Sequence, residues 1–154
     1  RFFGGEKIIC QRKCVGKPIF SYSDSDCYLT QTFNIIKTER VNSKYLTALL
    51  NSKLVEFWLR NKGKMQGLNF QLDKEPLQQI PIKLAPLNVQ EQLSDILENI
   101  ISAIAVHQNA DIKEYEDQID HIVYHLYDLT YDEVLIVDPE TPITREEYEN
   151  FSLE

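Results

Sequence analysis

Hydrophobic and polar positions in the first 40 residues follow the short alternation that is typical of β-strands. Stretches rich in Ile, Phe, Tyr and Thr cover residues 7–12, 18–22 and 27–37. Gly16, Pro18 and the Ser- and Asp-rich cluster at 21–26 separate them, because these residue types favour turns. The pattern predicts two or three antiparallel strands.

Helical spacing begins after residue 42. Apolar residues recur at offsets of 0, 3, 4, 8, 11 and 12, at Leu46, Leu49, Leu50, Leu54, Phe57 and Trp58. This spacing places them on one face of a helix, which Asn42 or Ser43 can cap and Gly63 can end. A glycine-containing loop at 61–67 then leads into extended pieces at 68–72 and 79–84. Two prolines favour an edge strand or a linker for the second piece.

The remaining sequence is predicted to be helical. Three capping-box pairs precede apolar stripes, at Asn88 and Glu91, Asp111 and Glu114, and Thr130 and Glu133. The first two helices should form an antiparallel hairpin with Ile101 and Ile119 in its seam. A short helix ends near Val137, and the tail at 139–154 contains a weak helix that begins at Thr144.

These elements predict an α+β fold with three parts. Residues 1–86 form a lobe in which a small antiparallel or mixed sheet packs against a helix. Residues 87–137 form the helical hairpin and the short helix, and residues 138–154 form a tail.

Composition narrows the function classes. Hydrophobic residues make up 43% of 154 residues, enough for a packed core. The sequence has no apolar run of 18 residues and no secretion signal, so we expect a cytoplasmic protein that does not enter membranes. It begins with Arg1, and we expect it to be a piece of a longer chain. Three cysteines are too few for a disulfide framework, and Cys10 and Cys14 lack a second ligand pair for zinc.

The net charge of −8 is unevenly divided. Residues 1–80 carry 13 basic and 7 acidic side chains, whereas residues 81–154 carry 3 basic and 17 acidic ones. The first part is therefore suited to phosphate groups and the second part repels them.

Two long runs carry a family resemblance. They are LNSKLVEFWLRNKGKMQG at 50–67 and LDKEPLQQIPIKLAPLNVQEQLSDIL at 72–97. With KIICQR at 7–12 and IDHIVYHLYDLTYDEV at 119–134, they resemble the TaqI-like C-terminal specificity domain of type IIG restriction–modification enzymes. Specificity subunits of type I systems are similar in organisation. The resemblance covers about residues 5–137.

The resemblance implies a bacterial target-recognition domain that binds double-stranded DNA and contacts the methyltransferase part of its parent chain. That parent would combine an adenine-N6 methyltransferase, which uses S-adenosylmethionine, with an endonuclease that uses Mg²⁺. This sequence contains no Asn-Pro-Pro-Tyr motif, glycine-rich cofactor loop or acid–lysine nuclease pattern. We therefore expect a fragment without catalytic residues, cofactor or metal of its own.

Candidate DNA contacts follow from side-chain chemistry. Phosphate groups attract Lys and Arg, while Asn and Gln match the edge of adenine and Arg that of guanine. The cationic candidates are Arg12, Lys13, Lys17, Arg40, Lys44, Lys53, Arg60, Lys62 and Lys64, of which Arg12 and Arg60 can also read guanine. The amide candidates are Gln66, Asn69 and Gln71. The loop at 61–71 is favoured, although each of these side chains can equally be a solvated surface residue.

Other patterns favour structural roles. Phe2, Phe3, Tyr22, Tyr28 and Tyr45 are interpreted as core aromatics rather than base-stacking residues. The pair His121 and His125 has metal-ligand spacing but no third ligand, and the Asp24-Ser25-Asp26 sequence is typical of a turn. Two other functions stay open: a protein-interaction module built on the acidic hairpin, and an enzyme fragment with an unrecognised site.

Overall fold

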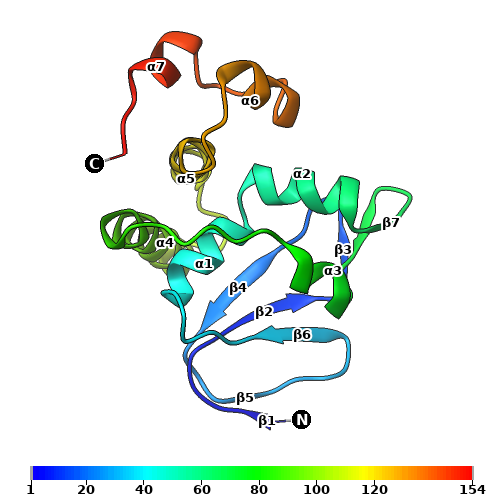
Figure 1. Ribbon diagram of the computed structural model, residues 1–154. Coiled ribbons are helices and arrows are strands. Elements are labelled where there is room, and N and C mark those ends of the chain that lie inside the picture. Colours follow the sequence, from blue (N-terminus) through cyan, green and yellow to red (C-terminus); the bar gives the residue numbers. More distant parts are fainter. Residues whose placement is uncertain (1, 154) are drawn as a thin grey trace.

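The structure is a computed structural model that describes the backbone of residues 2–153 and the side chains of residues 4–153 (Figure 1). The strands are β1 (Phe2–Phe3), β2 (Lys7–Gln11), β3 (Lys13–Val15), β4 (Phe20–Ser23), β5 (Cys27–Tyr28), β6 (Phe33–Ile36), β7 (Lys64–Gln66) and β8 (Asn69–Gln71). The helices are α1 (Ser43–Leu50), α2 (Lys53–Lys62), α3 (Lys74–Gln79), α4 (Leu87–Val106), α5 (Lys113–Leu126), α6 (Tyr131–Val137) and α7 (Arg145–Asn150). The predicted α+β class is confirmed.

Short antiparallel sheets form the first part of the chain. One sheet has the order β4-β2-β6, a second has the order β3-β8-β7, and β1 pairs with β5. In Figure 1 the sheets lie at one end of the molecule and α6 and α7 lie at the other, with α1, α4 and α5 between them. Within residues 2–153 no helix is both long and apolar enough to cross a membrane.

The strand predictions need two corrections. The stretch at 27–37 is not one strand but two, β5 and β6, which the turn at 29–32 separates. The predicted loop at 61–67 is the first half of a hairpin, because β7 pairs with β8 across a turn of two residues, Gly67 and Leu68. Gly67 has a φ of +63°, which favours glycine over residues with a Cβ atom.

The helix predicted after Asn42 is interrupted. Asn42 caps α1 as expected, but α1 ends at Leu50 and α2 starts at Lys53. Asn51 leaves the helix and its side-chain amide accepts from the N–H of Phe20 and donates to the C=O of Phe20, at 2.9 and 2.7 Å. Ser52 then caps α2 by accepting from the N–H of Val55. The prediction of one helix was therefore wrong, because two local caps outweigh a continuous apolar stripe.

One hydrophobic core joins the sheets to the helices. It includes Ile8 and Phe20 from the strands, Leu49 from α1, Leu93 from α4 and Val123 from α5. The segment between α3 and α4 forms no strand, which fits the linker interpretation rather than an edge strand. The three-part division at 86 and 137 stays a prediction.

The predicted seam between α4 and α5 is half right. The two helices contact each other, and Ile119 is buried with 4% of its surface exposed. Ile101 is 41% exposed and lines the groove where α4 meets α5, so it lies at the margin of the seam and is not buried in it as predicted. The buried residues of α4 end at Ile100.

Capping boxes form at the last two helices, α6 and α7, but not at α4 and α5. Thr130 with Glu133 forms the predicted box, and Thr144 with Glu147 forms another where a helix was expected to begin. The boxes predicted at Asn88 and Asp111 do not form. Helix α4 starts earlier, with Pro86 as its N-cap, whose C=O accepts from the N–H of Gln90 at 3.0 Å.

Candidate functional site

The outer face of the sheet β3-β8-β7 gathers polar side chains from distant parts of the chain. The strand register places Lys13, Gln71 and Lys64 in one row and Val15, Asn69 and Gln66 in the next. Residues that pair directly across antiparallel strands project from the same face. Five of the predicted site residues therefore lie together. Strands β7 and β8 come from the favoured loop at 61–71, whereas β3 comes from an earlier part of the chain.

The inner face of the same sheet is apolar. Cys14 and Phe70 are buried and Met65 is partly buried. The guanidinium carbon of Arg60 lies 5.4 Å from the centre of the Phe70 ring, and Arg60 also pairs with Glu56 at 3.6 Å. Arg60 is thus engaged at the back of the sheet, and the outer face is held rigidly by packing from behind.

The acidic residue Asp73 borders the outer face. Its carboxylate oxygen Oδ2 accepts from Nε2 of Gln71 at 3.1 Å and lies 3.3 Å from Nζ of Lys64. Asp73 occupies the N-cap position of α3, yet its side chain makes no capping hydrogen bond there. The carboxylate therefore bonds side chains of the sheet face and not the backbone at the start of α3.

A basic groove adjoins this face. It has a volume of about 670 Å³, and its lining includes Arg12, Lys37 and Lys74 together with Asn34 and Gln78. Arg12 and Lys74 directly adjoin Lys13 and Asp73 in the chain, so the groove begins one residue from the sheet face at both points. No acidic residue is among the described residues that line it. The sequence patterns did not single out Lys37 and Lys74, since only the fold brings them to Arg12.

Three other predicted cations face the acidic helices instead. The pairs are Lys17 with Glu116 at 3.4 Å, Lys44 with Glu98, and Lys53 with Asp138 at 3.1 Å. They neutralise part of the charge contrast between the two halves of the chain. Arg40 and Lys62 are exposed, and within residues 2–153 they form no ion pair. Whether any of the predicted residues contacts DNA stays a prediction.

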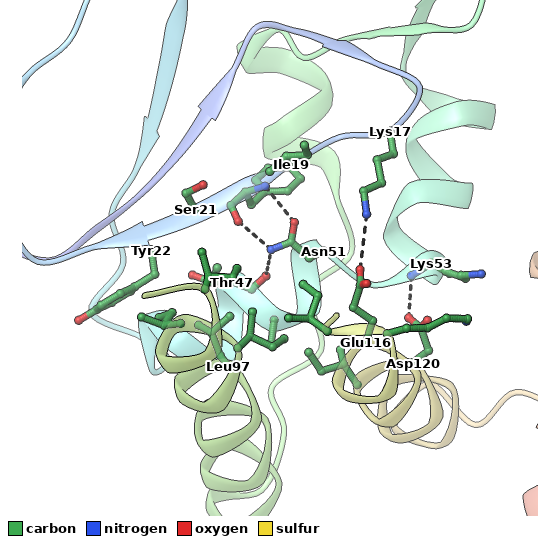
Figure 2. Close-up of a pocket in the computed structure, with 18 of the residues that line it drawn as sticks. Lys17, Ile19, Ser21, Tyr22, Thr47, Asn51, Lys53, Leu97, Glu116 and Asp120 are labelled. Atoms are coloured by element: carbon green, nitrogen blue, oxygen red, sulfur yellow. Dashed lines mark hydrogen bonds and ion pairs between the residues drawn. The ribbon is translucent and has the colours of Figure 1, made fainter. Parts of the chain in front are cut away.

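Figure 2 shows the larger groove, of about 850 Å³, where β4 meets α4 and α5. Lys17 reaches across it to Glu116, and Asn51 bonds the edge of β4. Apolar side chains such as Ile19 and Leu97 alternate with these polar contacts along its wall. Because its cations are already paired, this groove offers little free positive charge.

Asp120 lies at the same junction and is only 6% exposed. Its Oδ1 accepts from the backbone N–H of Lys53 at 2.9 Å, at the start of α2 (Figure 2). Burial raises the pKa of Asp120 to about 7, although the hydrogen bond from Lys53 opposes the rise. The carboxyl group therefore titrates close to neutral pH.

Replacing Asp120 with Asn should stabilise the protein at alkaline pH. The pKa of Asp120 is higher in the folded state than its ordinary value of 3.8, so the protonated carboxyl group favours the folded state, and it does so fully at pH values below 3.8. This contribution is lost as the pH rises towards 7. Asp120→Asn stays neutral and keeps an acceptor for Lys53, so its advantage should grow from near zero at about pH 4 to about 1–3 kcal/mol at about pH 8. Urea unfolding of both proteins across this range measures the difference, and a less stable variant at pH 8 would contradict it.

The aromatic and histidine interpretations have mixed outcomes. Tyr45 is a core residue and Tyr22 is partly buried, but Tyr28 is 80% exposed, so its core assignment was wrong. The side chains of Phe2 and Phe3 lie outside the described residues.

His121 and His125 stack against Tyr148 and Phe151 near α7. Burial lowers the pKa of both imidazoles. Within residues 2–153 no group of three or more His, Cys, Asp or Glu side chains is placed to hold a metal ion. Asp26 in the predicted turn accepts from the N–H of Gly5 at 3.1 Å.

Comparison with known proteins concentrates on the sheet-bearing part. Residues 1–82, more than half of the chain, match the family described as TaqI-like C-terminal specificity domain. Two type II methyltransferases from Haemophilus influenzae, M.HincII and M.HindII, are each 30% identical to the chain over 101 residues. The alignments cover 61% of this chain but only 20% of each methyltransferase. Every residue of the outer face and the basic groove falls within the matched range.

Proposed function

Because the chain belongs to the family of TaqI-like C-terminal specificity domains, we propose that it recognises a specific sequence in double-stranded DNA. The observation that carries the proposal is the outer face of the sheet β3-β8-β7. There the strand register brings two lysines and three side-chain amides together on one exposed surface. Lysines bind phosphate without regard to sequence, whereas amides discriminate between base edges.

The mechanism is binding alone. Lys13 and Lys64 on the sheet, with Arg12, Lys37 and Lys74 in the groove, bind backbone phosphates and fix the position of the sheet on the duplex. A two-stranded ribbon such as β7-β8 fits the width of the major groove, where each base pair presents a distinct pattern of donors and acceptors. Lys17, Lys44 and Lys53 pair with carboxylates of the acidic half, and the proposal assigns them no DNA contact.

The proposal extends to the parent enzyme. The relatives are type II methyltransferases, and the chain spans a fifth of their length. The parent would be a type IIG restriction–modification enzyme in which this domain directs adenine-N6 methylation and cleavage. This sequence has no glycine-rich cofactor loop and no acid–lysine nuclease pattern, which supports placing S-adenosylmethionine and Mg²⁺ elsewhere. Both would bind to other parts of the parent.

Single lysine replacements test the interface. Lys13→Ala and Lys74→Ala should each weaken binding to all duplexes alike, by roughly five- to tenfold at about 0.1 M salt, because each removes one phosphate contact. Lys17→Ala is the matched control, since Lys17 is paired with Glu116 and should change the affinity by less than about twofold. Fluorescence anisotropy with labelled duplexes measures all three. An equal loss for the control would place the DNA interface elsewhere.

A further inference from the structure

We propose that Gln71 reads an adenine and that Asp73 is the residue that positions it for this contact. The inference rests on the proposed function and names one element of the DNA target, an A·T base pair opposite strand β8. Gln71 is in the central strand of the sheet, between Lys13 and Lys64 in the same row. It is thus the amide that both cations flank.

The orientation of the Gln71 amide is fixed by chemistry. A carboxylate at neutral pH only accepts hydrogen bonds, so the group of Gln71 that faces Asp73 must be the NH₂ group. Its carbonyl oxygen then points away from Asp73. A free glutamine would exchange its two amide ends by rotating about the terminal bond, whereas this one has a single favoured orientation.

What remains available on Gln71 matches adenine. One N–H is bonded to Asp73, which leaves one N–H donor and the carbonyl acceptor. This pair complements N7 and the N6 amino group on the major-groove edge of adenine. Guanine presents two acceptors on that edge, so the carbonyl oxygen of Gln71 would meet another acceptor and the contact would be unfavourable.

The placement of Asp73 argues for this role over a capping role. Asp is a favoured N-cap residue, and here it holds the N-cap position without making the capping bond. A negative charge beside a phosphate-binding face also weakens DNA binding in general. Despite these two unfavourable effects, Asp73 bonds both Gln71 and Lys64 through the same oxygen atom, Oδ2. Positioning these two side chains explains the arrangement.

The test is selection of duplexes from a randomised pool by the chain and its variants, followed by sequencing of the bound fraction. Gln71→Ala and Asp73→Ala should both lose the preference for adenine at the same single position, a loss of about 5- to 150-fold in discrimination. Asp73→Asn should keep the preference, because the ammonium of Lys64, which can only donate, holds the amide oxygen of Asn where Oδ2 accepts from Gln71. The variant should also bind all duplexes more tightly. Gln79→Ala is the control, since Gln79 is an exposed glutamine on α3 that belongs neither to the sheet nor to the lining of the basic groove.

The outcomes separate the two proposals. If Asp73→Asn loses the preference as Asp73→Ala does, or if Gln71→Ala leaves it unchanged, Gln71 is not positioned by Asp73 to read adenine and this inference is wrong. If the unmodified chain selects no sequence at all, the proposed function fails with it. A thermal melt of each variant confirms that it is folded before selection.

Discussion

The affinity of the chain for duplex DNA should fall on the order of several hundred-fold when salt rises from about 50 to about 200 mM. The sheet face and the basic groove together present five cations, Arg12, Lys13, Lys37, Lys64 and Lys74. Each phosphate that they neutralise releases condensed counterions, and the logarithm of the affinity falls by about 0.9 per contact for each tenfold rise in salt. Titrations of one duplex at several salt concentrations give the slope directly.

The same titration distinguishes the main alternative. A protein-interaction module with an incidental basic half would bind DNA weakly, and its partner binding would follow the acidic helices instead. A slope near zero would therefore favour that alternative. A slope much steeper than five contacts allow would mean that Arg40 and Lys62, which are exposed, also bind phosphates.

Ile119→Ala should destabilise the protein by about 2–5 kcal/mol. Ile119 is buried on α5 within the core that α1 and α4 share, so its truncation leaves a cavity there. Ile101→Ala is the matched comparison: the same change on α4, at a position that is 41% exposed, should destabilise by less than about 1 kcal/mol.

Urea unfolding of the two variants gives both values. Because one core joins the sheets to the helices, we expect a single unfolding transition in each case. Equal losses for the two variants would mean that α4 and α5 pack through the seam that the sequence pattern predicted. An early separate transition in Ile119→Ala would mean that the helices fold apart from the sheets.

Local signals in the sequence predicted those parts of the fold that depend on neighbouring residues. The box predicted at Thr130 formed and the helix expected at Thr144 begins there, whereas the boxes predicted at Asn88 and Asp111 did not form. The break after α1 was missed in part because one of its two causes is distant: besides the local cap by Ser52, the side chain of Asn51 bonds Phe20, 31 residues earlier. The helical spacing of apolar residues continues across Asn51 and Ser52, so it does not predict the contact between Asn51 and Phe20.

Buried charge was equally hard to foresee. Lys7 begins β2 and is fully buried, and its ammonium group donates to the backbone carbonyls of Gly5 and Ser25. A lysine at the end of a strand normally predicts a side chain that is exposed to solvent. Only the folding of two turns over Lys7 supplies the carbonyl oxygens that make its burial possible.

The candidate site residues were predicted from their side-chain types, and the strand pairs and ion pairs of the structure then corrected the set. Gln66, Asn69 and Gln71 were chosen for their amides, and β8 does place them with Lys64. Lys13 joins them only because β3 pairs with β8. Lys17 and Lys44 are engaged elsewhere, because their partners Glu116 and Glu98 come from the acidic half, which no local pattern connects to them.

The amide of Asn51 gives strand β4 a neighbour that is not a strand. β4 is at the edge of its sheet, and an open edge is a template on which a second molecule can add its own strand. By satisfying both the N–H and the C=O of Phe20, Asn51 occupies the place where such an intruding strand would form its first two hydrogen bonds. The helix break at this residue therefore also blocks the addition of another strand at the Phe20 end of β4.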